Sequence, residues 1–175
     1  MITRLKEVLA KPDPALGYFN GELRFYLGWA QEVDGNHAAA EESWRQARSE
    51  LEALLTEQPD NHNLFADLAL TNMGLGDKAA AFAFVDKGIA LVPIEKDAID
   101  GTIPIEILAR VAAQMGEPDR AIAALEKLLV TPGSGADGIP LTPALLRLDP
   151  MFDPLRNEPR FQKLVVSEGP HRTGN

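Results

Sequence analysis

The chain has 175 residues and a formal net charge of −9, which comes from 17 basic and 26 acidic side chains. This length predicts one domain or one compact array of repeats, and the acidic charge disfavours a nucleic acid as partner. The sequence has no cysteine, which excludes disulfides, thiolate metal sites and cysteine nucleophiles. Only 6% of the residues are aromatic, while alanine and leucine are abundant, and this composition favours helices over sheets.

The first segment, 1–12, is short and amphipathic, and we expect a partial helix that Pro12 and Pro14 bring to an end. It lacks the apolar core and the cleavage site of a secretion signal. No apolar run reaches the roughly 18 residues that a transmembrane helix needs, so we expect no membrane insertion and a cytoplasmic location. Half a hairpin in this place fits either a piece of a longer protein or an atypical terminal repeat, and both interpretations stay open.

Three glycines, Gly35, Gly76 and Gly116, recur at intervals of 41 and 40 residues. Each follows a leucine paired with a small residue, and each precedes an alanine by five residues and a large apolar residue by nine. The pattern predicts helical hairpins that cross closely at the small residues and whose first helix ends at a left-handed glycine. The matching positions are Leu27 with Gly28, Ala40 and Trp44; Leu68 with Ala69, Ala81 and Val85; and Leu108 with Ala109, Ala121 and Leu125.

The hairpin repeats are expected at 15–59, 61–93 and 94–131, within a single array over 1–166. The second helix of the first repeat is predicted to continue to Gln58, because proline follows there. The first and third repeats have six residues more than the second between the preceding proline and the glycine. This surplus predicts either a longer first helix or a short extra turn before it.

The second repeat, Asn61 to Pro93, resembles a tetratricopeptide (TPR) repeat, although Asn72 replaces the usual tyrosine. The resemblance implies an all-α solenoid, a right-handed superhelix of about three repeats with a C-terminal capping segment. It also implies a function in protein–protein interaction. The residues that follow the family's pattern are Phe65, Leu68, Ala69, Ala81, Val85 and Pro93.

Residues 91–166 are also similar to the C-terminal TPR regions of bacterial signalling proteins, which lie downstream of serine/threonine kinase, adenylate cyclase or winged-helix regulator domains. The similar stretches are Leu91 to Gly101, Gly116 to Ala121 and Leu146 to Gln162. This second resemblance implies a regulatory module that is linked to a catalytic or DNA-binding domain.

The segment 140–166 is predicted to fold back as a cap on the last hairpin, because an open array has to cover the apolar side of its last unit. Two Asp-Pro pairs, at 149–150 and 153–154, each join an N-cap to a proline suited to the first helical position, and they predict two short turns. Residues 167–175 are expected to form a flexible tail. A last helix is expected to place on one face Phe161, Leu164 and Val165.

The sequence offers little to support catalysis, and we expect no enzymatic activity, no cofactor and no metal site. The string Gly133 to Gly138 matches a nucleotide-binding pattern, but it lacks the strand before it and the helix after it that such a site needs, so it is predicted to be a loop. The three histidines, His37, His62 and His171, are too scattered to suggest a metal centre. The numerous acidic residues are expected on exposed helix faces.

In TPR arrays the first helix of each hairpin lines a concave groove, and the resemblance implies the candidate binding residues here. Three pairs with i, i+4 spacing fall on those faces: Phe25 with Trp29, Ala66 with Leu70, and Glu106 with Arg110. The neighbouring candidates are Glu22, Tyr26, Asn63, Asp67, Ile103 and Ile107.

The aromatic group of Phe25, Tyr26 and Trp29 allows two interpretations. These side chains can anchor an interface, or they can be core residues beneath a helix formed by 1–10. Trp44 falls on the packing position of the repeat itself and is expected in the core.

Some TPR domains hold the terminal carboxylate of a peptide with lysine, asparagine and arginine on these same faces. Here the faces carry Asp67 and Glu106, with Arg110 as the lone base. A clamp for acidic peptides is therefore disfavoured, and an apolar or basic segment is the predicted ligand.

These features predict a non-enzymatic module that binds a peptide or a partner domain in its groove. The alternative is a sensor domain that closes around a small ligand or a peptide effector. A closed apolar pocket with a few convergent polar groups would favour the sensor, whereas an open trough along all three hairpins would favour the module.

Overall fold

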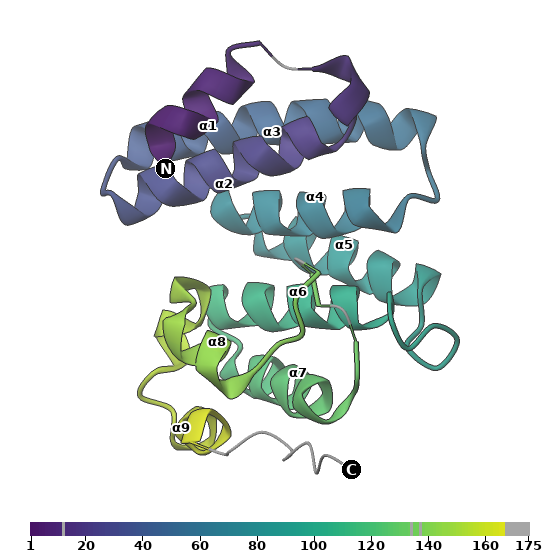
Figure 1. Cartoon of the computed structure of the whole chain (residues 1–175), viewed down its shortest axis with the longest axis vertical. Helices are drawn as coiled ribbons and strands as arrows, with labels where there is room; N and C mark the ends of the chain where they lie inside the picture. The colour runs from purple at the N-terminus through teal and green to yellow at the C-terminus, as the bar shows by residue number, and fades with distance from the viewer. Residues whose placement is uncertain (12, 134, 137, 167–175) are drawn as a thin grey trace, which may run out of the picture. The chain divides into compact units, whose positions relative to one another are not determined.

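In a computed structural model, the helices of the chain gather in two compact units, Met1–Leu91 (unit 1) and Val92–Asn175 (unit 2) (Figure 1). The residues that the structure describes contain helices, turns and loops but no strand, which confirms the all-α prediction for them. A single array over 1–166 stays a prediction. None of the helices found in this part of the chain is both long and apolar enough to cross a membrane. The structure describes residues 1–11, 13–133, 135–136 and 138–166.

Unit 1 consists of a short helix followed by two helical hairpins. Its elements are α1 (Ile2–Leu9), the 3-10 helix η1 (Pro14–Leu16), α2 (Phe19–Val33), α3 (His37–Glu57), α4 (His62–Gly74) and α5 (Lys78–Leu91). Within the hairpins α2 pairs with α3 and α4 with α5, while α3 packs against α4 and α1 against α2. The first helices of the two hairpins, α2 and α4, run side by side in the same direction (Figure 1).

Left-handed glycines end the first helix of each hairpin in this unit. Gly35 has a φ of 80° and Gly76 a φ of 75°. After Gly35 the N–H of Asn36 donates to the carbonyl of Gln31 at 2.8 Å, as in a Schellman motif. The recurring glycines therefore have the role that their spacing predicts.

Trp44 packs where the two hairpins of unit 1 meet. A Cβ atom added to Gly28 would lie 2.4 Å from the indole Nε1, and one added to Gly74 would lie 2.5 Å from its Cδ2. The indole N–H donates to the carbonyl of Phe25 at 3.2 Å, and the side chain is only 4% exposed. The expected core role of Trp44 is confirmed. The other recurring positions of this unit are also buried, namely Ala40, Leu68, Ala69, Ala81 and Val85.

The long second helix α3 extends this core beyond the first hairpin. It ends at Glu57 and has Gln58 as its C-cap, close to the predicted end. A Cβ atom on Gly21 would lie 2.5 Å from Cδ2 of Leu51, so α2 and α3 approach closely there as well. Buried apolar side chains of α3 and α4 meet in one cluster, Ala47, Leu51, Leu64 and Leu68, against which Tyr18, Leu54, Leu55 and Phe84 pack.

Unit 2 is one hairpin covered by a C-terminal segment. Its elements are α6 (Thr102–Gln114), α7 (Pro118–Val130), α8 (Pro143–Leu148), the 3-10 helix η2 (Pro150–Leu155) and α9 (Pro159–Val166). The hairpin of α6 and α7 turns at Gly116, which has a φ of 72°. Because α6 has 13 residues, as α4 does, the surplus residues of the third repeat form a turn and not a longer helix.

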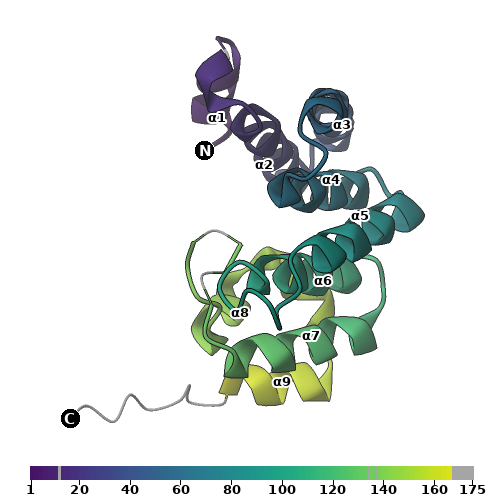
Figure 2. The same cartoon turned by 90° about the vertical axis from the view of Figure 1, so that its right-hand side faces the viewer.

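The C-terminal segment folds back on both helices of this hairpin. It places η2 against α6, α9 against α7 and α8 against α9, and Figure 2 shows α7 between α6 and α9. Its buried side chains are Leu146, Met151, Phe152, Leu155 and Phe161. Leu164 and Val165 are half-buried. The expected tail, 167–175, lies outside the described residues.

The prediction of two short turns in this segment is wrong. Asp149 does cap a turn, since its Oδ1 accepts a hydrogen bond from the N–H of Met151 at 2.9 Å. Asp153 does not cap a second one, because its Oδ1 accepts from Nε of Arg156 at 2.8 Å. Both Asp-Pro pairs therefore belong to the single 3-10 helix η2 and its cap.

Candidate functional site

Two helix faces of unit 1 bring four polar side chains together, which we call the acidic cluster: Tyr18, Glu22, Asn63 and Asp67. Tyr18 and Glu22 lie one turn apart at the start of α2, and Asn63 and Asp67 lie one turn apart on α4. The Asn63 amide donates to the phenol oxygen of Tyr18 at 3.3 Å. Because α2 packs against α4, the two pairs face each other.

Local hydrogen bonds fix the starts of both helices. Asn61 caps α4, since its Oδ1 accepts from the N–H of Asn63 at 3.1 Å. In the first turn of α2, the Asn20 side-chain amide donates to the carbonyl of Asp13, which precedes the helix, at 2.9 Å. The acidic cluster therefore lies at the starts of two helices that local hydrogen bonds fix. The close contact of Gly21 with Leu51 also keeps the start of α2 near the core.

Asp67 is the least satisfied member of the cluster. The residue is 8% exposed, and its Oδ2 atom is buried with no hydrogen-bond partner among the described residues. Burial raises the pKa of Asp67 well above its usual value, and the negative charge of Glu22 raises it further. In the folded protein this carboxyl group therefore resists losing its proton.

The pKa of Tyr18 is affected by the same negative charges. Partial burial raises the pKa of its phenol, and the charges of Asp67 and Glu22 add to this effect. Two carboxyl groups and a phenol in one place disfavour further negative charge.

The two helices that form the cluster contain few lysine or arginine side chains. Arg24 is the only lysine or arginine of α2, and it points to α3, where its Nη2 lies 2.8 Å from Oε1 of Glu50. Its Nη1 also donates to Oε1 of Gln46 at 3.0 Å. The sequence of α4 contains neither lysine nor arginine.

A second unsatisfied polar atom lies one turn beyond Asp67. Thr71 is fully buried, and its hydroxyl oxygen has no hydrogen-bond partner within the part of the chain that is described. Residues four apart on a helix share a face, so the two unsatisfied groups are neighbours on α4. Such atoms are rare in folded proteins and call for an explanation.

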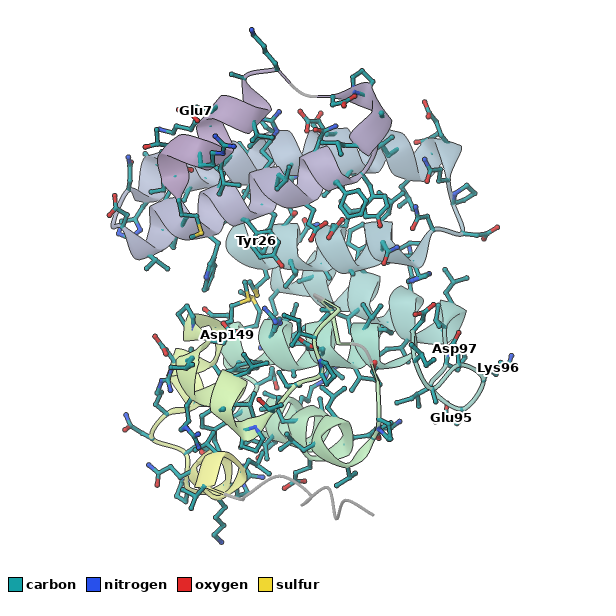
Figure 3. All side chains as sticks on the ribbon, viewed as in Figure 1. Glu7, Tyr26, Glu95, Lys96, Asp97 and Asp149 are labelled. Carbon is teal, nitrogen blue, oxygen red and sulfur yellow. The ribbon has the colours of Figure 1, made fainter. Side chains whose placement is uncertain are left out.

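The aromatic candidates of α2 divide into buried and half-buried residues. Phe25 is 1% exposed and so belongs to the core, whereas Tyr26 and Trp29 are half-buried; a cover formed by the helix at 1–10 stays a prediction. The rings of Phe25 and Tyr26 meet edge to face at 5.3 Å. Figure 3 shows Tyr26 reaching from α2 toward α4. Of the other candidates on α4, Ala66 is half-buried and Leu70 is buried.

Two of the candidates of unit 2 belong to a buried polar network. Glu106 is 2% exposed, and its Oε1 accepts from Nε of Arg110 at 3.1 Å and from Nη2 at 2.7 Å. The Nη1 atom of Arg110 lies 3.3 Å from Oδ2 of Asp149, which Figure 3 labels at the start of η2. Arg110, expected as the lone base of a groove, is therefore buried between two carboxylates of its own unit.

The chain itself covers the α6 face. The N–H of Ala136 donates to Oε2 of Glu106 at 3.0 Å, and the Gln114 amide donates to the carbonyl of Met151 at 2.7 Å. A Cβ atom on Gly133 would lie 2.3 Å from the Thr102 side chain. The predicted loop thus packs on α6, although Ser134 and Asp137 within it lie outside the described residues. Of the two isoleucine candidates, Ile107 is buried and Ile103 is half-buried.

Sequence reasoning missed three participants, Tyr18, Thr71 and Asp149. Extending the i, i+4 pattern of Glu22 back by one turn would have found Tyr18, and extending that of Asp67 forward would have found Thr71. Asp149 gave no comparable signal, because it reaches Arg110 from the C-terminal segment.

The described residues hold no group of three or more histidine, cysteine, aspartate or glutamate side chains that could bind a metal ion. Nδ1 of His37 lies 2.9 Å from Oε1 of Glu32 beside the first hairpin turn, and His62 begins α4. His171 lies outside the described residues. The acidic cluster brings together two carboxyl groups, one phenol and one amide.

Comparisons of the chain with protein-family models, with curated proteins and with solved structures found no match. A function therefore has to be inferred from the geometry of the two units.

Proposed function

We propose that the chain is a non-enzymatic, TPR-like module that binds a peptide or a partner domain on the first-helix face of its hairpins. The recurring small residues and left-handed glycines support the repeat character of the hairpins. The resemblance of residues 91–166 supports a regulatory role in a larger bacterial signalling protein, with a cytoplasmic location. An apolar or basic segment is the proposed ligand.

The observation that carries this proposal is the occupant of the α6 face. There a first-helix face holds a segment of the same chain, through the bonds from Ala136 to Glu106 and from Gln114 to Met151. Such a contact is an intramolecular counterpart of peptide binding, because backbone groups of the covering segment pair with side chains of the helix.

The α2 face of unit 1 supplies apolar anchors for an external segment. Trp29 is half-buried, and Val33, one turn further along, is 64% exposed. Aromatic side chains of this kind commonly dominate the binding energy of an interface. The acidic cluster lies at the other end of the same helix, so a basic segment along α2 would meet apolar and acidic groups in turn.

The test is a selection from a random peptide library on the full chain, followed by affinity measurements on the selected peptides. We expect Trp29→Ala to weaken binding by about tenfold or more and Val33→Ser to weaken it less. Val130→Ser is the matched control, because Val130 is also the exposed last residue of a helix. Peptides that bind both unit 1 variants as tightly as the wild type, with unchanged circular dichroism, would contradict the proposal.

A further inference from the structure

The loop between α7 and α8 contacts the start of α6 through backbone groups. Three of its described residues, Gly133, Gly135 and Ala136, make these contacts, and we call them the strap. Gly133 lies against the side chain of Thr102, and the N–H of Ala136 donates to Oε2 of Glu106 at 3.0 Å. Thr102 and Glu106 are one helical turn apart. The strap therefore follows the helix face, and it does so with two residues that have no side chain.

The bend at Gly135 requires glycine. Gly135 is buried and has a φ of 68°. A Cβ atom there would lie 2.1 Å from the carbonyl oxygen of Ile139 and 3.1 Å from Oε2 of Glu106. The carbonyl of Gly135 also accepts a hydrogen bond from the N–H of Gly138 at 3.2 Å. An alanine at this position would strain the backbone and collide with it, so it should weaken the contact of the strap with α6.

Glu106 keeps its ion pair when the strap is absent. Its Oε1 accepts from Nε and Nη2 of Arg110, and Nη1 of Arg110 lies 3.3 Å from Oδ2 of Asp149. None of these contacts involves the strap. Release of the strap therefore removes one hydrogen bond from Oε2, and the N–H of another segment can replace that bond.

We infer that the strap is an intramolecular competitor of the partner peptide. It occupies the start of the α6 face in the free protein, and the peptide displaces it by donating a backbone N–H to Oε2 of Glu106. This inference rests on the proposed function and adds regulation to the same face. Because only molecules with a displaced strap can bind, the apparent affinity is reduced by the fraction in which the strap is bound.

The experiment selects peptides from a random library on the full-length variant Gly135→Ala and then measures their affinity for the wild type. We expect the variant to bind them about tenfold more tightly, because its strap is already weakened. Ala136→Pro, which removes the N–H that Glu106 accepts, should also bind more tightly than the wild type. Gly116→Ala is the matched control and should bind like the wild type. Gly116 has a φ of 72° in the same unit, but a Cβ atom there would meet no described atom within 4 Å.

Amide hydrogen exchange measured by NMR follows the strap itself. In the wild type, exchange at Ala136 should become faster when a selected peptide is added, because the peptide takes the place of its hydrogen bond to Glu106. Exchange at Ala136 that the peptide leaves unchanged would overturn the inference. So would equal affinities of the wild type, Gly135→Ala and Ala136→Pro. If Gly135→Ala does not fold by circular dichroism, the selection and the comparison are made with Ala136→Pro.

The selected peptides also distinguish this inference from the proposed function. Peptides that depend on Trp29 but bind the wild type and both strap variants equally would overturn the inference alone. Peptides that depend neither on Trp29 nor on the strap would overturn the proposed function as well.

Discussion

Unit 1 and unit 2 each bury a carboxyl group on the first helix of a hairpin, but the hydrogen bonding of the two carboxyl groups differs. In unit 2, Glu106 accepts two hydrogen bonds from Arg110 and one from the N–H of Ala136. In unit 1, Asp67 has a buried oxygen that finds no hydrogen-bond partner among the described residues, and a second acid, Glu22, lies beside it. The first carboxylate is bonded to a covering segment, whereas the second has an oxygen with no hydrogen bond among the described residues.

This contrast predicts opposite effects on stability when each of the two charges is removed. A buried acid that its own unit satisfies ties two parts of the fold together, and its removal is felt as lost stability. A buried acid that its own unit leaves unsatisfied lowers the stability of the free protein, and such a cost is typical of binding sites.

The largest effect is expected from Arg110→Met, which leaves Glu106 buried and unpaired. Breaking one partner of a buried ion pair costs about 3–5 kcal/mol. The free energy of unfolding from urea denaturation, followed by circular dichroism, measures this loss. Tryptophan fluorescence should change less, because both tryptophans, Trp29 and Trp44, belong to unit 1.

Two further variants check the cause of that loss. Arg45→Met breaks an exposed pair with Glu41 on α3, and it should cost only about 0.3–0.5 kcal/mol. Adding Glu106→Gln to Arg110→Met removes the unpaired charge and should recover part of the stability. If Arg110→Met costs no more than Arg45→Met, the network of unit 2 does not hold its covering segment.

The second effect has the opposite sign, since Asp67→Asn should stabilise the free protein by about 1–3 kcal/mol at neutral pH. Folding raises the pKa of Asp67 above the ordinary value of 3.8, so the wild type is favoured below that pH and loses stability as the pH rises through the folded pKa. Asparagine does not titrate. The gap between variant and wild type should therefore widen from pH 3.8 upward and level off above the folded pKa.

Urea denaturation at a series of pH values measures this gap, with tryptophan fluorescence as the readout of unit 1. Glu52→Gln serves as the control, because Glu52 is exposed and its removal should leave the pH dependence as in the wild type. A gap that stays constant with pH would show that Asp67 titrates normally. The contrast with Glu106 would then disappear.

The hairpins could be predicted from the sequence because their signals are local and periodic. The glycine at Gly35 or Gly76 ends a helix through its own backbone, and Trp44 packs on Gly28 at a fixed offset along the chain. The repeat positions also gave Glu22 and Asp67 as neighbouring candidates. These features depend on few residues that lie close together in the sequence or at matching positions of successive repeats.

The occupation of the α6 face could not be predicted in the same way. Arg110 has the same local sequence whether it faces solvent or pairs with Asp149, which lies in a distant segment. The same holds for Phe25, whose burial depends on tertiary packing and not on its position in the repeat. Periodicity identifies a helix face, but it does not identify what covers that face.

The smallest effect concerns Tyr18, whose phenol pKa should lie above 10.0 and should fall toward that value in Asp67→Asn. Negative charge nearby disfavours the phenolate, so removing the charge of Asp67 eases ionisation. The chain has two tyrosines, and Tyr26→Phe assigns the absorbance of the phenolate to Tyr18. A smaller decrease is expected from Glu22→Gln, because the charge of Glu22 contributes less than that of Asp67. If the Tyr18 pKa is the same in Asp67→Asn as in the wild type, Asp67 does not set the electrostatic potential at the cluster, and its carboxyl group is not the main source of negative charge there.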